Sequence, residues 1–219
     1  MPSRGSRRSE QEREARKSRR QENRRAGLLE AAREVLAEHG VGGLTMEAVA
    51  AAADVSKPSV FYYFRTKEEL VGALVAEQHA AEVAVLERAI AAAPNGVEAL
   101  VALLRAKVDF YADDLDSFRV AYLWPQLLGV PPEVLREHVY PASQRVNDAL
   151  ESRLKEDARA GRLAPGFEPR RLANLAWTTA HGLLSLVAGM EQMGGSTRHT
   201  LTQLRDEACV LLRRAGTGA

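Results

Sequence analysis

The feature that most constrains how this chain folds is residues 45–67, TMEAVAAAADVSKPSVFYYFRTK. Apolar residues recur at helical spacing after Thr45, a residue type that caps helix N-termini, so a first helix is predicted from about Thr45 to Ala53. After a short turn, Ser56 is placed to cap a second helix whose first turn holds Pro58, where the missing backbone N–H costs nothing. Two short helices joined by so short a turn form a helix-turn-helix.

Helices are also predicted on both sides of this element. The preceding helix should run from about Arg24 to His39 and end at Gly40, because glycine commonly terminates helices. The following helix should start near Thr66 and continue to about Ala93, where the sequence Pro-Asn-Gly stops it.

These residues resemble the TetR-type bacterial transcriptional regulators over about residues 24–72. The residues that keep the family's spacing are Thr45, Val49, Ala50, Val55, Ser56, Lys57, Tyr63, Phe64, Lys67, Glu68, Glu69 and Leu70. The chain departs from the family pattern at Asp54, where Gly is common, at Pro58, where a small residue usually follows the lysine, and at residues 61–62, where Tyr-His is frequent. Asp tolerates a left-handed turn, so the first change is compatible with the fold. The other two lie on the helix that reads DNA and leave the operator sequence open.

The resemblance implies how this domain would divide its contacts with double-stranded DNA. Phosphate contacts are expected from Thr45, Ser56, Tyr63 and Lys67, supplemented by N-terminal arginines, Arg24 and Arg25 among them. Base-edge contacts are expected from Lys57, Pro58, Ser59 and Tyr62. Lys57 is a candidate partner for guanine and Pro58 for a thymine methyl group. Packing within the domain is the alternative for the neighbouring aromatic residues, and Phe61 or Phe64 is expected in the core.

The net charge of +1 conceals an asymmetry along the chain. Residues 1–25 contain ten Arg or Lys and four Glu, a net charge of +6, which leaves −5 for the remainder. This distribution favours a polyanion partner at the N-terminal end. Residues 1–22 show no apolar periodicity and are predicted to be a disordered basic arm that lies along DNA phosphates or enters a minor groove. A solvated tail without function and a partly helical extension with Glu–Arg pairs are the alternatives.

Composition predicts a soluble protein of the cytoplasm. The length of 219 residues with 46% apolar residues is enough for one or two domains with a sizeable core. A single cysteine, Cys209, excludes a disulfide framework within the chain and fits a reducing compartment. No run of about 18 apolar residues occurs and the N-terminus is charged, so neither a membrane span nor a secretory signal is predicted.

The chain is predicted to be all-α, with a three-helix head over residues 23–68 and a helical body over residues 69–219. Beyond the long helix that starts near Thr66, body helices are expected near 97–112, 116–128, 132–161, 169–193 and 197–214. Pro125 and Pro141 lie where helix is expected, so each should kink or restart its helix. The family resemblance implies that this body binds a ligand and forms a dimer.

Two groups of residues in the body are candidate contacts for a small-molecule effector. They comprise Phe110, Tyr111, Phe118, Tyr122 and Trp124, followed by Trp177 and His181 on a later helix. One interpretation is ordinary core packing, and the other is an apolar pocket in which polar groups orient a ligand. The pattern W-x-x-x-H-G at Trp177, His181 and Gly182 resembles a signature of one group of TetR-type C-terminal domains. A core or interface role is favoured for His181.

The last two predicted helices carry small and apolar residues, which cover more than one stripe of the first of them, and the excess must be buried against something. The resemblance implies that they form a four-helix interface with a twofold mate. Such a homodimer would present two reading helices to a palindromic operator.

Enzyme and metal motifs are missing from the sequence. It contains no GxGxxG after a strand, no phosphate-binding loop, no GxSxG and no HExxH, so no enzyme, cofactor or metal site is predicted. Glu133, Glu137 and His138 lie close together, but a solvated helix face is their expected role. The sequence therefore predicts a homodimeric regulator, most often a repressor released by a small apolar or aromatic effector. The alternatives are an effector-free architectural DNA-binding protein and, less favoured, a small-molecule binding protein that has lost DNA binding.

Overall fold

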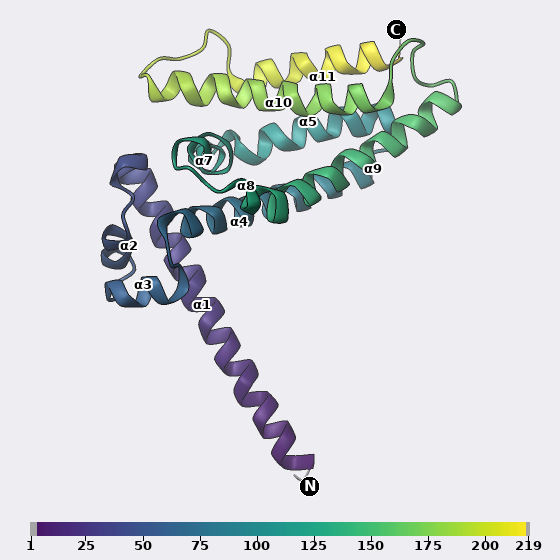
Figure 1. Cartoon of the computed structure of the whole chain (residues 1–219). Coiled ribbons are helices and arrows are strands. Elements are labelled where there is room, and N and C mark those ends of the chain that lie inside the picture. Colours follow the sequence, from purple (N-terminus) through teal and green to yellow (C-terminus); the bar gives the residue numbers. More distant parts are fainter. Residues whose placement is uncertain (1–3, 218–219) are drawn as a thin grey trace. The chain divides into compact units, whose positions relative to one another are not determined.

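The structure, a computed structural model, describes the backbone of residues 4–217 and, apart from His138, the side chains of residues 13–217. Within this range it is helical and has no strand, which confirms the predicted all-α class (Figure 1). The helices are α1 (Arg4–Gly43), α2 (Met46–Ala52), α3 (Lys57–Tyr63), α4 (Lys67–Ala92), α5 (Gly96–Ala112), α6 (Leu115–Phe118), α7 (Trp124–Leu127), α8 (Pro132–Val134), α9 (Tyr140–Arg159), α10 (Pro169–Gln192) and α11 (Leu201–Thr217), with π-helical turns η1 (Arg119–Leu123) and η2 (Leu135–Val139). Two compact units divide between Leu74 and Val75, inside α4, whereas the sequence predicted the boundary after residue 68.

The N-terminal unit is a helical head in which α2 packs against both α1 and α3. Its buried apolar residues are Leu28, Leu29, Ala32, Val35, Leu36, Leu44, Met46, Val49, Val60, Phe64 and Leu70. Phe64 is fully buried, whereas Phe61 is 40% exposed, so Phe64 is the aromatic residue that belongs to the core. The packing of Val60 and Phe64 holds α3 on the head with its other face toward solvent.

The turn between α2 and α3 depends on Asp54. Its φ of +50° is the only positive φ at a non-glycine position in the described part of the chain. The Asp54 N–H donates to the Ala51 carbonyl at 3.2 Å and the Val55 N–H donates to the Ala50 carbonyl at 3.0 Å, which is the hydrogen-bond pair of a Schellman motif. Asp occupies the left-handed position that glycine usually takes, as the sequence predicted.

Helix α1 begins at Arg4, well before the predicted start near Arg24. Residues 4–22 are therefore helical rather than a disordered arm, and residues 1–3 of that predicted arm lie outside the described residues. The stretch is rich in Arg, Glu and Gln, which are good helix formers, and the Ser18 hydroxyl donates to the Glu22 carboxylate one turn later at 3.0 Å. The structure has the helical extension that the sequence left open as an alternative.

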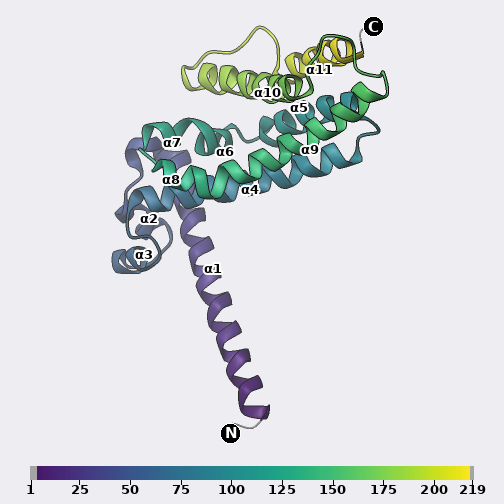
Figure 2. The same ribbon diagram turned by 45° about the vertical axis from the view of Figure 1, so that its right-hand side comes forward.

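In the C-terminal unit, α9, α10 and α11 pack against α5 (Figure 2). The buried apolar residues that they share include Leu100, Leu103, Leu104, Leu150, Leu154, Ala173, Ala176, Ala180 and Leu212. A side chain at Gly96 would meet the Arg153 carbonyl oxygen at 2.5 Å, so only glycine allows this close approach to α9. Buried Asp157 accepts a hydrogen bond from the Val97 N–H at 2.8 Å. These contacts fix the N-terminus of α5 and so the position of the side chains that α5 carries into the core.

Both predicted interruptions at proline are present. Each proline is preceded by a π-helical turn, η1 before Pro125 and η2 before Pro141. Proline has no N–H and clashes with the carbonyl four residues earlier, and a π-turn, in which the hydrogen bond spans one more residue, accommodates both defects. The predicted helices 116–128 and 132–161 are therefore divided into α6, η1 and α7, and into α8, η2 and α9.

Candidate functional site

Helix α3 presents most of its predicted base-contacting residues to solvent. Lys57 and Pro58 are exposed in its first turn, and Tyr62 is 71% exposed near its end. Ser59 is half-buried, and its hydroxyl lies 2.9 Å from the Ser56 hydroxyl, so these two groups share one hydrogen bond. Ser56 occupies the N-cap position, as predicted, without a side-chain bond to the helix backbone. The exposed row of α3 offers polar groups of the kind that read base edges in a major groove.

The ammonium group of Lys57 is paired with an acidic neighbour. It forms an ion pair with Glu47 of α2 and lies 5.7 Å from the centroid of the Phe61 ring. The hydrogen bond from Lys57 lowers the pKa of the Glu47 carboxyl, so the carboxylate is ionised at neutral pH. Both side chains are at least half exposed, and ion pairs of this kind are weak. Lys57 can therefore exchange Glu47 for another acceptor at small cost.

Two of the residues expected to contact phosphates lie at helix N-termini. Thr45 Oγ1 accepts a hydrogen bond from the Ala48 N–H at 3.0 Å and caps α2, as predicted. Thr66 Oγ1 accepts from the Glu69 N–H at 3.1 Å at the start of α4, whose first turn contains Lys67. The partial positive charge of a helix N-terminus, reinforced by Lys67, favours an anion at this position.

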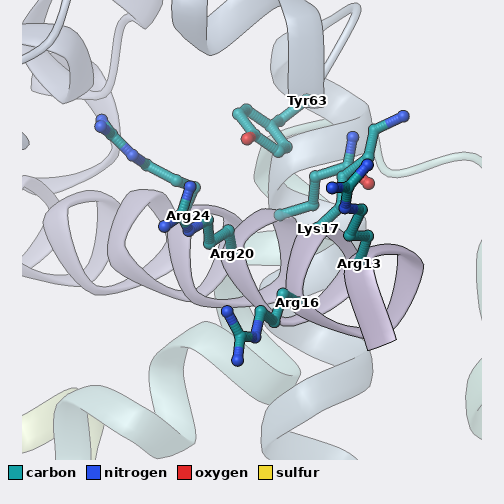
Figure 3. Close-up of a pocket in the computed structure, with 7 residues that line it drawn as sticks. Arg13, Arg16, Lys17, Arg20, Arg24 and Tyr63 are labelled. Carbon is teal, nitrogen blue, oxygen red and sulfur yellow. The ribbon is translucent and has the colours of Figure 1, made fainter. Parts of the chain in front are cut away.

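A row of basic residues on α1 continues this surface. The row, called the basic stripe below, consists of Arg13, Arg16, Lys17, Arg20 and Arg24. Each member lies three or four residues from another member, so the five residues share one broad side of the helix, and they line a groove together with Gln21 and with Tyr63 of α3 (Figure 3). The Gln21 amide donates to Tyr62 Oη at 3.3 Å. Two predicted phosphate contacts, Arg24 and Tyr63, thus lie in one groove.

Arg25 lies on a different side of α1 from the basic stripe. The central carbon of its guanidinium is 4.9 Å from the centroid of the Phe64 ring, a cation–π distance. Arg25 is solvent-exposed, but it does not line the groove that contains Arg24. The structure therefore separates two arginines that the sequence had grouped together.

Six of the seven predicted effector residues of the body form an aromatic cluster, which does not include Trp124. Ring contacts with centroid separations of 4.7 to 6.2 Å link Phe110, Tyr111, Phe118, Tyr122, Trp177 and His181. The Trp177 and His181 rings are stacked, with their centroids 5.0 Å apart and an angle of 9° between their planes. Their spacing of four residues therefore places them on one face of α10. Tyr111, Phe118 and Trp124 are buried as core residues, whereas Tyr122, Trp177 and His181 are half-buried. The half-buried residues are the ones that a ligand can reach with the smallest rearrangement.

A buried polar cluster that the sequence analysis missed lies beside these rings. Glu82 of α4 and Lys107 of α5 form an ion pair from which solvent is excluded. The hydroxyls of Tyr111 and Tyr122 donate to Glu82 Oε2 at 2.8 and 2.6 Å, and Lys107 Nζ donates to Tyr122 Oη at 2.9 Å. Nδ1 of His79, which is also buried, lies 3.3 Å from Tyr122 Oη. The cluster ties α4, α5 and η1 together through charge as well as through apolar contacts.

The sequence carried a signal for half of this cluster. Lys107 lies four residues after Leu103 and four before Tyr111, so it shares the buried face of α5. A charge at a core position requires an opposite charge or a polar partner. Helical spacing within α5 does not show which acidic residue supplies that partner, because Glu82 lies on another helix.

Burial and pairing act in opposite directions on the titration of this cluster. Burial alone would raise the pKa of Glu82, but the Lys107 ammonium and the hydrogen-bonded His79 outweigh it and hold that pKa at about 2. Burial lowers the pKa of Lys107, and attraction to Glu82 opposes this effect. Burial and the Glu82 charge raise the pKa of Tyr122 well above its ordinary value, so its hydroxyl remains protonated. Burial, with the Lys107 charge, lowers the pKa of His181, whose buried Nδ1 has no hydrogen-bond partner among the described residues. His181 thus offers a neutral imidazole with one unused hydrogen-bonding position.

Among the side chains of residues 13–217 other than His138, no three or more His, Cys, Asp or Glu are grouped so that they could hold a metal ion. The side chain of His138, which the sequence groups with Glu133 and Glu137, lies outside the described residues. Glu133 instead pairs with Arg136 at 2.7 Å on an exposed surface. None of the helices described combines the length and apolar character needed to cross a membrane.

Two kinds of comparison with known proteins gave matches, one for the head and one for the fold of most of the chain. Residues 28–74 match the family model described as bacterial regulatory proteins, tetR family. Comparison with curated protein sequences gave no significant match. Among solved structures, a bacterial regulatory protein in the tetR family from Rhodococcus RHA1 superposes with a TM-score of 0.69 at 23% identity, covering 88% of this chain and 96% of that chain.

Two further solved structures were determined with bound molecules. The transcriptional regulator FadR from Bacillus subtilis, in complex with stearoyl-CoA, superposes with a TM-score of 0.69 at 20% identity, covering 87% of this chain and 98% of its own. AibR, in complex with isovaleryl coenzyme A and operator DNA, superposes with a TM-score of 0.67 at 20% identity, covering 88% of this chain and 99% of its own. At these identities the likeness establishes the fold, and it extends over both units of the chain.

Proposed function

We propose that this chain, a TetR-family protein by its residues 28–74, is a ligand-responsive transcriptional regulator that binds a palindromic operator as a homodimer. We further propose that it acts as a repressor and is released by a small effector. The observation that carries the proposal is the exposed row of Lys57, Pro58 and Tyr62 on α3 beside the basic stripe. One compact unit thereby offers groups that read bases and groups that bind phosphates.

In the proposed complex, α3 enters the major groove. Lys57 leaves Glu47 to donate to guanine, the Pro58 ring contacts a thymine methyl group, and the Tyr62 hydroxyl contacts a base edge. Tyr63 and the N-termini of α2 and α4 bind phosphates and fix the register of the head on the duplex. The phosphate contacts set affinity and its salt dependence, whereas α3 sets sequence preference.

The proposed dimer interface is the outward face of α10 and α11. Helix α10 has no Asp, Glu, Lys or Arg between Leu172 and Met190, and its Leu175 and Leu186 are 52% and 51% exposed. Gly182 lies between these two leucines, and a side chain there would meet no atom within 4 Å. A second copy of the chain would cover this uncharged face and form a four-helix interface, and the resulting twofold symmetry is what a palindrome requires.

The effector is proposed to contact Tyr122, Trp177 and His181. The three residues offer aromatic surface together with the unused imidazole nitrogen of His181. A small apolar or aromatic molecule suits such surroundings. Because two neighbours in structure were solved with stearoyl-CoA and with isovaleryl coenzyme A, acyl-CoA thioesters are the first effectors to screen.

Helix α4 provides the proposed link between the effector and DNA. It carries Glu82 in the C-terminal unit and Lys67 at its start in the N-terminal unit. A ligand that displaces Tyr122 disturbs its hydrogen bond to Glu82, and with it the position of α4. The effector must bind one position of α4 more tightly than the other, because a ligand with equal affinity for both states shifts nothing.

An effector-free DNA-binding protein is the second candidate function. The complete burial of Tyr111 and Phe118 favours it, because these rings act as core residues. In that case the body would serve only to dimerise. Acyl-CoA thioesters and other apolar molecules would then leave operator binding unchanged at every concentration.

Selection of bound fragments from random duplex DNA tests the proposal. The expected result is a sequence with two inverted half-sites, bound by two chains, with affinity that falls steeply as salt is raised. Recovery of duplexes without sequence preference would contradict the regulator and favour an architectural protein. A unique half-site bound by one chain would contradict the dimer.

A further inference from the structure

The basic stripe of α1 is an ordered feature of the head. Its first and last members, Arg13 and Arg24, are 11 residues apart in one continuous helix, so they are about 16 Å apart along its axis. All five members are solvent-exposed. The two glutamates of this stretch, Glu14 and Glu22, do not line the groove, and Glu22 accepts its hydrogen bond from Ser18 instead. Positive charge is thus concentrated along one side of the helix.

The stripe is connected to the reading helix within the same compact unit. Gln21 lines the groove with the basic residues, and its amide donates to Tyr62 Oη. Tyr63 of α3 lines the same groove (Figure 3). Tyr62 is among the residues proposed to contact bases. The surface that reads DNA therefore continues onto α1 without an intervening acidic or apolar patch among the residues that line this groove.

We propose that the basic stripe is a second binding site for duplex DNA, which lies along the sugar-phosphate backbone beyond the base pairs that α3 reads. This inference rests on the proposed function of α3. Duplex DNA carries about one phosphate charge per 1.7 Å of its axis, so about 16 Å of duplex presents roughly ten charges, about five on each strand. The five cations of the stripe match the charge on one strand over this length. Such contacts add affinity and lengthen the footprint but carry no sequence information.

An anionic membrane surface is a poorer match for the same stripe. A helix that lies in a membrane interface needs a large apolar face opposite its basic one. Residues 13–27 contain no Leu, Ile, Val, Phe, Met or Trp. The opposite side of this segment presents Ser18 and Glu22, which would resist insertion among acyl chains.

Neighbouring positions on α1 supply a matched test. The triple variant combines Arg13→Gln, Arg16→Gln and Arg20→Gln. Two single variants are compared with it: Arg20→Gln changes a residue of the stripe, and Arg19→Gln changes a neighbour that does not line the groove. Gln and Arg have similar helix propensity, so circular dichroism should show unchanged helix content. Affinity for the selected operator is measured at several salt concentrations, with the full-length chain throughout.

The triple variant should lower the slope of log affinity against log salt by about 2.7 per bound chain, since each lost phosphate contact removes about 0.9. Arg20→Gln should lower the slope by about 0.9, and Arg19→Gln should leave it unchanged. The sequence preference of all variants should equal that of the wild type. Lengthening the duplex beyond the half-sites should raise the affinity of the wild type but not that of the triple variant.

Several results would overturn the inference while leaving the proposed function intact. If the wild type binds its operator and the triple variant keeps the wild-type slope, the stripe does not contact DNA. Equal slope changes for Arg19→Gln and Arg20→Gln would show a general charge effect without a defined surface. If the triple substitution lowers affinity for duplex RNA more than affinity for duplex DNA of equal length, the stripe would be assigned to RNA binding. Failure of the wild type to prefer any DNA sequence would instead refute the proposed function itself.

Discussion

Each unit of the chain contains a Glu–Lys ion pair that joins two helices, and the two pairs differ in their surroundings. Glu47 and Lys57 join α2 to α3 on the surface of the N-terminal unit, where both side chains are at least half exposed. Glu82 and Lys107 join α4 to α5 inside the C-terminal unit, where both are fully buried. Water can replace either partner of the surface pair, so that pair can exchange for DNA at small cost. No solvent can replace a partner of the buried pair, so it fixes the position of α4.

Removal of one partner from the buried pair should have the largest effect. Lys107→Ala leaves the Glu82 carboxylate buried without its cation and should lower the free energy of unfolding by about 3–5 kcal/mol. The double variant Glu82→Gln, Lys107→Met removes both charges, so its free energy of unfolding should fall much less than that of Lys107→Ala. Urea unfolding followed by circular dichroism measures both variants. The control is Lys155→Ala, which breaks an exposed pair with Glu151 and should leave the free energy of unfolding nearly unchanged.

The buried pair should also control the stability of the protein in acid. The folded-state pKa of Glu82 is about 2, below its ordinary value of 4.5, so the contribution of the carboxylate is complete above about pH 4.5 and is lost as the pH falls toward 2. This difference corresponds to roughly 3 kcal/mol. The double variant Glu82→Gln, Lys107→Met should lose less stability than the wild type over that interval. Parallel losses in the two proteins, measured by urea unfolding at each pH, would show that other groups dominate acid unfolding.

Substitutions at Asp54, in the turn between α2 and α3, should change the free energy of unfolding by a smaller amount. Asp54→Gly should raise the free energy of unfolding by about 1 kcal/mol, because glycine adopts a positive φ without the steric cost that other residues have. Asp54→Ala should lower it, since Ala has neither the freedom of Gly nor the local hydrogen bonding of Asp. Thermal unfolding distinguishes the two. Stabilisation by both variants would show that charge at this position matters more than backbone conformation.

Removal of the acidic partner from the surface pair should have the smallest effect. Glu47→Gln releases Lys57 from its ion pair and should raise operator affinity by no more than about fivefold, because an exposed ion pair of this kind is weak. Fluorescence anisotropy with the selected operator measures this change. The control Glu38→Gln removes the same charge from an exposed residue of α1. If both variants raise affinity equally, the gain reflects net charge and the pair with Lys57 contributes nothing.

The comparison of the two pairs also shows what the sequence could predict. Local rules were sufficient where a residue's role depends on its chain neighbours. They placed the left-handed turn at Asp54 and the interruptions at Pro125 and Pro141. They also placed a break at Gly40, where α1 has a positive φ of +64° and its backbone leaves the helical conformation. The same rules predicted the exposed positions of Lys57, Pro58 and Tyr62 on α3, but they left open whether Phe61 or Phe64 packs inward.

Interactions between helices distant in sequence were beyond those rules. Lys107 is recognisable as a charge on a buried face, but its partner Glu82 depends on how α4 packs on α5. The helical form of residues 4–22 was missed for another reason. These residues have no apolar periodicity, but they are rich in good helix formers, and a helix that continues from a packed segment needs no buried face of its own.

The most direct test of the account compares Lys57→Ala with Lys67→Ala on the selected operator and on a scrambled duplex over a range of salt concentrations. Lys57 lies on the exposed row of α3, and Lys67 lies in the first turn of α4. Lys57→Ala should reduce the ratio of operator affinity to scrambled affinity. Lys67→Ala should weaken both duplexes equally and lower the salt slope by about 0.9 per chain. Equal losses on both duplexes for both variants would contradict the assignment of sequence reading to α3 and phosphate binding to the start of α4.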